Sequence, residues 1–105
     1  DPDRATSLMR AYYKRSEEAN LYFSDFNGEG WMSDRGLVYI VFGPPSRVVL
    51  DGNKEIWFFN SEQAEYGLQM VFSHGAKVRL DRSLDYKQSW YLTVDGWRNG
   101  KVSNL

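Results

Sequence analysis

Six consecutive apolar or aromatic residues, Leu37 to Phe42, constrain the fold more than any other feature of this sequence. The run is short enough for a β-strand, and it is too uniform for a strand with one solvent-facing side. Gly43-Pro44-Pro45 then ends the run, because proline cannot donate to a β-ladder and restricts the residue before it. The pattern therefore predicts a central strand over residues 37–42.

Two hairpins are predicted after this strand. Their strands are short and rich in apolar residues, and they span residues 47–50, 54–59, 68–72 and 76–80. The connections Asp51-Gly52-Asn53 and Ser73-His74-Gly75 carry residues that are typical of turns. In the last strand apolar residues alternate with Lys77 and Arg79, which predicts one wet face. The polar segment 60–67 between the hairpins is predicted to be a loop.

Helices are predicted near both ends of the chain. Residues 3–23 place apolar side chains at helical spacing, and the helix ends before Asn27-Gly28-Glu29-Gly30. Aromatic and apolar residues at helical spacing favour a second helix over residues 83–98. Residues 91–95 also alternate, and Asn99-Gly100 is suited to a hairpin turn. A C-terminal hairpin therefore stays open as an alternative.

These elements predict an α+β fold, with a mainly antiparallel sheet of about four to five strands, an N-terminal helix and a C-terminal helix. A chain of 105 residues is expected to form a single domain over residues 1–105. The sequence begins at Asp1 and shows no signal-peptide pattern. We therefore expect the domain to be cut from a longer precursor.

Charge and composition argue against several classes of function. Thirteen basic and fourteen acidic residues give a net charge of −1, which provides no field to attract nucleic acid. No apolar run approaches the ~18 residues of a membrane-spanning helix. The chain has no cysteine and one histidine, whereas zinc sites need three or four nitrogen or sulfur ligands. We therefore predict no nucleic-acid partner, no membrane-spanning segment, no metal site and no cofactor.

The segment from Arg15 to Pro45 resembles the GWxTD domain, a family of uncharacterised bacterial proteins. The resemblance rests on Arg15, Ala19-Asn20, Phe23, GWMSDRG at residues 30–36, Tyr39, Ile40, Gly43-Pro44-Pro45 and Glu55-Ile56-Trp57. Ser33 stands where the motif has threonine, a change that keeps the hydroxyl group. The resemblance implies a domain of secreted, periplasmic or outer-membrane-associated bacterial proteins, with no assigned activity.

The GWMSDRG segment contains the residues of the predicted binding site, Trp31, Ser33, Asp34 and Arg35. Ser33 and Asp34 are residue types that cap helices and form turns. The favoured interpretation is a folded corner that joins helix to sheet, with Arg35 paired to a carboxylate. The alternative makes the same corner a recognition surface, with Trp31 and Arg35 presented to a partner.

Other residues that suggest chemistry have simpler structural explanations. A catalytic Ser33 would need an adjacent base, and His74 is predicted to be a solvated turn residue at a hairpin tip. The segment Asp25 to Gly30 begins like a calcium loop. The position that requires a bidentate glutamate is Gly36, however, so an ordinary glycine turn is favoured. We therefore predict no catalytic residues and a protein that is not an enzyme.

The leading functional hypothesis is a non-catalytic interaction module of a bacterial envelope or secreted protein. Its partner would be another protein or a neighbouring domain of the same precursor. The alternative is a carbohydrate-binding module that uses exposed tryptophans, and a hydrolase with unidentified acids is a third hypothesis. Trp57 lies in a predicted strand, and Trp90 and Trp97 share a predicted helix face. Core packing is therefore favoured for these three rings, which leaves Trp31 as the remaining tryptophan.

Overall fold

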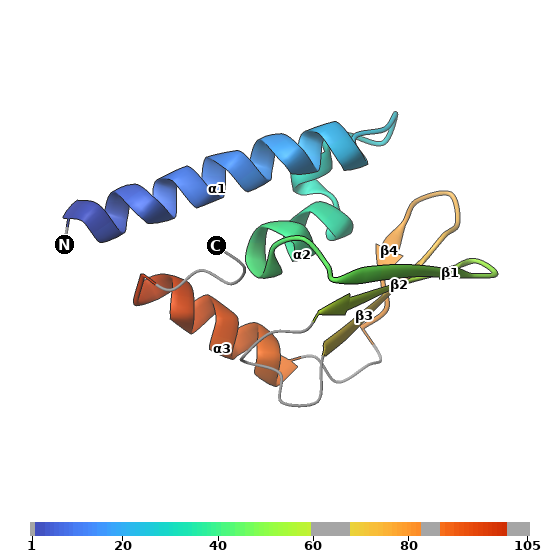
Figure 1. Ribbon diagram of the computed structural model, residues 1–105. Coiled ribbons are helices and arrows are strands. Elements are labelled where there is room, and N and C mark those ends of the chain that lie inside the picture. Colours follow the sequence, from blue (N-terminus) through green and yellow to red (C-terminus); the bar gives the residue numbers. More distant parts are fainter. Residues whose placement is uncertain (1, 60–67, 83–86, 101–105) are drawn as a thin grey trace.

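A computed structural model describes residues 2–59, 68–82 and 87–100, and these residues form an α+β fold (Figure 1). The elements in chain order are α1 (Pro2–Phe23), the short 3-10 helix η1 (Gly30–Met32), α2 (Asp34–Phe42), β1 (Arg47–Asp51), β2 (Lys54–Phe59), β3 (Leu68–Ser73), β4 (Arg79–Leu80) and α3 (Lys87–Arg98). The four strands make one antiparallel sheet in the order β1-β2-β3-β4. The predicted fold class is confirmed.

The predicted central strand over residues 37–42 is wrong, because this segment lies within the helix α2. Ser33 caps its N-terminus, where the Ser33 side chain accepts a hydrogen bond from the Gly36 N–H. At the other end Gly43 has φ 83° and ψ −170°, a conformation that is essentially restricted to glycine. The helix lies between α1 and the sheet (Figure 1) and is buried at most of its positions. A helix covered on both sides is apolar all round, and periodicity does not separate it from a buried strand.

The two predicted hairpins differ in how closely the structure follows the prediction. The first is confirmed, with Asp51 paired to Lys54 across the turn. In the second, β4 contains only Arg79 and Leu80, so the predicted strand 76–80 is too long. The Ala76 carbonyl accepts a hydrogen bond from the Asn27 side chain at 3.3 Å. The chain before β4 is therefore held by the loop that follows α1.

The hydrophobic core forms between α2 and the side of the sheet that faces the helices. Along β2 and β3 alternate residues point toward this side, and they are Glu55, Trp57, Phe59, Leu68, Met70 and Phe72. Trp57 is 2% exposed. The centre of its ring lies 4.8 Å from the centre of the Phe72 ring and 5.5 Å from the centre of the Phe23 ring. The prediction that Trp57 packs in the core is confirmed.

The helices at the two ends agree with the sequence prediction where the structure describes them. α1 begins at Pro2 and ends at Phe23, and α3 spans Lys87–Arg98. A helix therefore replaces the C-terminal hairpin alternative over residues 87–98. The predicted loop 60–67 and the predicted helical residues 83–86 lie outside the described residues. None of the helices in the described ranges combines the length and the hydropathy that a membrane span requires.

Candidate functional site

The GWMSDRG segment, residues 30–36, folds into the corner that joins α1 to α2 (hereafter the corner). Its two glycines lie against backbone. A Cβ atom on Gly30 would lie 2.0 Å from the Ala19 carbonyl oxygen, and one on Gly36 would lie 1.8 Å from the Gly30 carbonyl oxygen. Ser24 Oγ also accepts a hydrogen bond from the Gly30 N–H at 2.8 Å. The corner therefore depends on close backbone approach, which residues with a Cβ atom do not permit.

Ser33 holds the turn between η1 and α2. Its Oγ donates to the Gly30 carbonyl at 2.6 Å and accepts from the Gly36 N–H at 3.0 Å. The predicted capping role of Ser33 is confirmed, and a threonine hydroxyl has the same capacity to cap. Because the hydroxyl proton is committed to a backbone carbonyl, Ser33 is poorly placed to act as a nucleophile.

Asp34 connects the corner to the far edge of the sheet. Its Oδ2 accepts a hydrogen bond from the Leu80 N–H of β4 at 2.7 Å, and its Oδ1 lies 3.5 Å from an Arg82 guanidinium nitrogen. Asp34 is in the first turn of α2, where a negative charge is favourable. Asp34 was predicted to act as a cap at this turn, but Ser33 is the cap, and Asp34 instead accepts from a backbone N–H that is 46 residues away.

Arg35 reaches from the corner to the sheet. Its Nη1 forms an ion pair with Glu55 Oε1 at 3.3 Å, and its guanidinium lies 5.1 Å from the centre of the Phe23 ring. The side chains of Arg35 and Glu55 are 19% and 8% exposed. The predicted pairing of Arg35 with a carboxylate is therefore confirmed, although Arg35 Nε is buried and has no hydrogen-bond partner among the described residues.

Glu55 is a central member of this network, and it was not among the site residues predicted from the sequence. Its Oε2 accepts a hydrogen bond from Trp57 Nε1 at 2.6 Å, and its Oε1 lies 2.8 Å from His74 Nε2 as well as near Arg35. The signal was present, because Glu55 has the same parity as Trp57 along β2 and must share its face. His74 was predicted to be a solvated turn residue. It is about half-exposed, and its contact with Glu55 was not predicted.

A second set of contacts fastens α1 onto α2. Arg15 is buried, and its Nη1 donates to the Ile40 carbonyl at 3.0 Å. The Tyr39 hydroxyl donates to Glu18. Burial, followed by this hydrogen bond, raises the pKa of Tyr39 well above its usual range, and burial lowers the pKa of Arg15. These contacts fix the angle at which α1 enters the corner.

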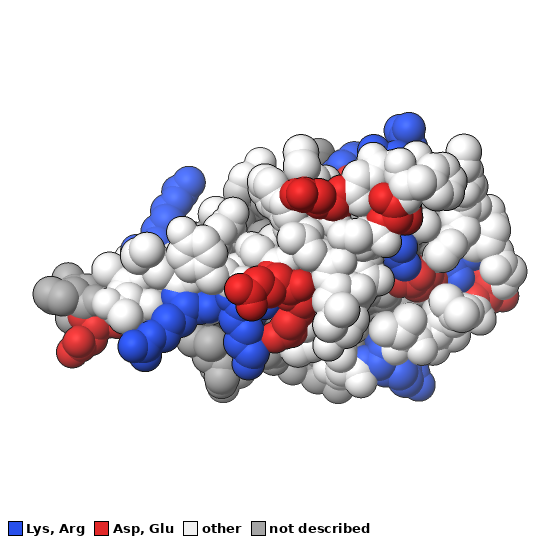
Figure 2. Space-filling model, turned by 90° about the horizontal axis from the view of Figure 1, so that it is seen from above, with Lys and Arg blue, Asp and Glu red and all other residues white. Residues whose placement is uncertain are grey.

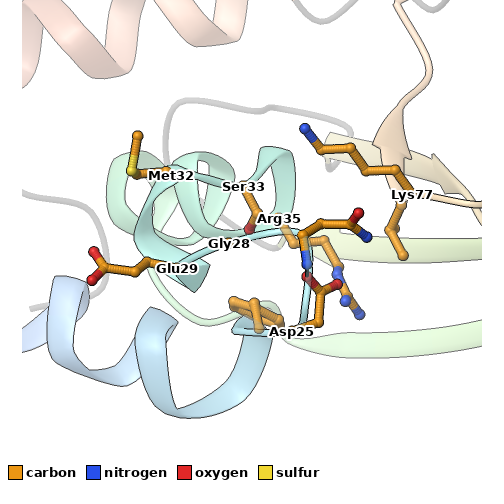
Figure 3. Close-up of a pocket in the computed structure, with 10 residues that line it drawn as sticks. Asp25, Gly28, Glu29, Met32, Ser33, Arg35 and Lys77 are labelled. Carbon is orange, nitrogen blue, oxygen red and sulfur yellow. Dashed lines mark hydrogen bonds between the residues drawn. The ribbon is translucent and has the colours of Figure 1, made fainter.

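A hollow of about 180 Å³ lies beside the corner (Figure 3). It is lined by Phe23, Asp25, Asn27, Gly28, Glu29, Met32, Ser33, Arg35, Lys77 and Val78. Figure 3 shows the Arg35 side chain extending toward Asp25. The side chain of Met32 and the amine of Lys77 point away from Arg35 and Asp25. In Figure 2, acidic and basic side chains are interspersed on the face seen rather than gathered by sign.

Apolar side chains are exposed next to the hollow. Phe26 is 96% exposed and Met32 is 70% exposed, while Trp31 is 37% exposed and donates from its indole nitrogen to Glu29 at 2.6 Å. The other three tryptophans differ from Trp31, because Trp57 is buried and Trp90 and Trp97 are half-buried. Of the four predicted site residues, the structure thus brings Ser33, Asp34 and Arg35 into internal contacts and places Trp31 at the surface.

The segment that begins like a calcium loop folds as a tight turn. Asp25 and Gly28 exchange backbone hydrogen bonds of 3.1 Å in both directions, and Asp25 Oδ1 accepts from the Asn27 N–H at 2.7 Å. Within the described ranges, the structure contains no group of three or more His, Cys, Asp or Glu side chains arranged to hold a metal ion.

Comparisons with known proteins identify one family. The model of the GWxTD domain matches residues 1–99. No curated protein and no solved structure matches the chain. The residues that correspond to the name of this family are Gly30, Trp31, Ser33 and Asp34, which lie in the corner. Because the match covers almost the whole sequence, the chain belongs to the GWxTD domain family.

Proposed function

We propose that this domain is a non-catalytic interaction module that binds a protein partner, or a neighbouring domain of its own precursor, at the corner and its hollow. Trp31 and Met32 supply the contact surface, and Arg35 lines the hollow. Ser33 and Asp34 position these side chains through their backbone hydrogen bonds. The observation that carries the proposal is an internally hydrogen-bonded corner with exposed apolar side chains beside a hollow.

The distribution of exposed apolar residues supports a macromolecular partner. Phe26, Trp31 and Met32 are all exposed within one eight-residue stretch of chain, 25–32. Clustered exposed apolar side chains are typical of protein interfaces, whereas single ones are common on any surface. Aromatic residues and methionine are also enriched in the centre of such interfaces. The near-neutral charge of the chain adds no preference for a strongly charged partner.

The polar contacts of the site favour binding over catalysis. The Ser33 hydroxyl is bonded to the Gly30 carbonyl and the Gly36 N–H, and His74 contacts Glu55. A nucleophile and its base would be expected to contact each other. An envelope or secreted setting is part of the proposal, and the family resemblance is its support.

A carbohydrate-binding module is the second candidate, and the structure gives it less support. Sugar rings stack on exposed aromatic side chains, usually on more than one. Trp57 is 2% exposed and is therefore unavailable to a ligand, and Trp31 is the one exposed tryptophan among the described residues. Carbohydrate binding at Trp31 remains an outcome that the following experiment detects.

The test replaces Met32 with a photo-activated cross-linking amino acid in the full-length precursor, in cells that produce it. The matched control carries the same amino acid at Tyr91 on α3, because both positions are 70% exposed. We expect a discrete adduct from position 32 and none from position 91. Mass spectrometry then identifies the adduct as another protein, another domain of the precursor or a glycan.

A second variant ties the adduct to the corner. Trp31→Ala should reduce the yield at position 32 by about tenfold, because aromatic side chains at the centre of an interface contribute much of its binding energy. Equal adduct yields from positions 32 and 91 would contradict the proposal. An adduct yield at position 32 that does not change in the Trp31→Ala variant would contradict it as well. A glycan adduct would favour the carbohydrate-binding alternative.

A further inference from the structure

β1 is an outer strand of the sheet, and its free side is a second candidate interaction surface. β1 pairs with β2 on one side, and no strand among the described residues pairs with the other side. An edge strand presents unpaired N–H and C=O groups that suit the addition of another strand. β4 forms the opposite edge but has two residues, so β1 offers the longer ladder.

The sequence of β1 is complementary to itself when a second copy runs antiparallel to it. The strand reads Arg47-Val48-Val49-Leu50-Asp51. If two copies pair about Val49, each Arg47 lies opposite an Asp51 of the other copy, and each Val48 lies opposite a Leu50. Directly opposed unlike charges and apolar pairs stabilise antiparallel strands. A shift of two residues places Arg47 opposite Val49 in one direction and Asp51 opposite Val49 in the other, so the charges select one register.

Both charged ends of β1 are available for such a pair. Arg47 lies 4.4 Å from the centre of the Phe58 ring but forms no ion pair with a described residue. Asp51 is opposite Lys54 in the β1–β2 ladder. The Lys54 amine, however, hydrogen-bonds to Ser73 Oγ at 2.6 Å. Asp51 likewise has no ion-pair partner in the part of the chain that the structure describes.

The helices leave room for a second copy. Val48 pairs with Trp57 and Leu50 with Glu55, so both side chains lie on the helix-facing side of the sheet. They are nevertheless 47% and 73% exposed. Figure 1 shows the β1–β2 hairpin projecting beyond α2, in agreement with this exposure. A two-fold axis perpendicular to the sheet at Val49 would keep the helices of both copies on one face and bring the exposed Val48 and Leu50 side chains together.

We propose that two copies of this chain associate through β1, antiparallel about Val49, to form one continuous eight-stranded sheet with paired Arg47 and Asp51 side chains. This surface is separate from the corner, so the inference does not depend on the proposed function. The contact is small, which makes the association weak and concentration-dependent.

Sedimentation equilibrium from about 10 µM to about 1 mM measures this association. We expect a monomer–dimer equilibrium, which Arg47→Asp and Asp51→Arg each weaken by about tenfold or more, because each places like charges opposite one another twice. The double variant Arg47→Asp/Asp51→Arg restores opposite charges and should return to within about threefold of the parent. Arg79→Asp on β4 is the matched control, with the same change of charge at the other edge of the sheet, and should have no effect.

A disulfide measures the register independently. The chain has no cysteine, and opposed residues of antiparallel strands have a Cα separation that permits a disulfide. Val49→Cys should therefore form a covalent dimer under mild oxidation, while Ile56→Cys on the inner strand β2 should not. A monomer at the highest concentration would overturn the proposal. So would a dimer that survives both charge reversals, or single variants that the double variant does not rescue.

Discussion

The corner and the helix-facing side of the sheet adjoin the same core, but different interactions hold them. At the sheet, large side chains such as Trp57, Phe59 and Phe72 fill the space beneath α2. At the corner, the absence of a side chain is what matters, because Gly30 and Gly36 have backbone oxygens where a Cβ atom would lie. One small core can therefore depend on large side chains that fill space in one region, and on glycines that let backbone segments approach in another.

The difference extends to the polar groups. At the corner, the Ser33 hydroxyl donates to one backbone carbonyl and accepts from one backbone N–H, and the Asp34 carboxylate accepts from another backbone N–H. On the sheet side, the main polar residue is the buried Glu55, which contacts Arg35, Trp57 and His74. Buried polar groups cost little when they are fully hydrogen-bonded and much when a partner is lost. Substitutions in the two regions should therefore destabilise the domain for different reasons.

Trp57→Ala should reduce the free energy of unfolding more than the other substitutions. It tests whether the sheet side of the core depends on large buried side chains. The ring is 2% exposed, so its removal leaves a cavity and also takes away the hydrogen bond to Glu55. We expect a loss of about 3–5 kcal/mol in the free energy of unfolding, measured by urea denaturation. A loss below about 1 kcal/mol would mean that this side of the core does not depend on filled volume.

Gly36→Ala should have the next largest effect and would test the corner. The added Cβ would lie 1.8 Å from a backbone oxygen, so α2 must move away from η1. We expect a loss of about 3 kcal/mol, at the upper end for overpacked sites. Gly75→Ala is the matched control, because its nearest contact would be at 3.9 Å. Equal unfolding free energies for the two variants would show that close backbone approach does not hold the corner.

Ser33→Ala should have the smallest effect of the three. It removes the side-chain cap from the Gly36 N–H, at a cost of about 1 kcal/mol. Ser33→Thr keeps the hydroxyl and should unfold within about 0.5 kcal/mol of the parent. The two variants separate the hydroxyl from the rest of the side chain. A lower unfolding free energy for Ser33→Ala, but not for Ser33→Thr, would assign the effect to the hydroxyl. Equal losses for both variants would instead point to the packing of the side chain.

Much of the fold follows from local signals in the sequence. The helical spacing of residues 3–23 and the turn at Asp51-Gly52-Asn53 each predict one element, and the structure has both. The burial of Trp57 follows from apolar neighbours on both sides of its strand. These predictions hold because the pattern of neighbouring residues indicates the element before its distant packing partners are known.

The rest depends on contacts between distant residues, which a single sequence does not reveal. The apolar run 37–42 is compatible with a strand and with a helix. It forms the helix α2 where α1 packs on one side of it and the sheet on the other. At the site, the capping role of Ser33 is local and was predicted. The partners of Asp34 and Arg35 are 46 and 20 residues away, so residue type indicated that partners exist but not which ones.

The burial of α2 has a consequence for the unfolded chain. Nine residues are too few for a stable isolated helix, so α2 is helical because of its neighbours. Released from them, residues 37–42 are uncharged, contain three β-branched residues and lack glycine and proline, which is the composition of segments that form intermolecular β-structure. Asp34 and Arg35 before the run and Gly43-Pro44-Pro45 after it are residues that interrupt such pairing. The same run that forms the centre of the native domain is thus its main aggregation liability, and the reversibility of thermal unfolding measures how well these flanking residues contain it.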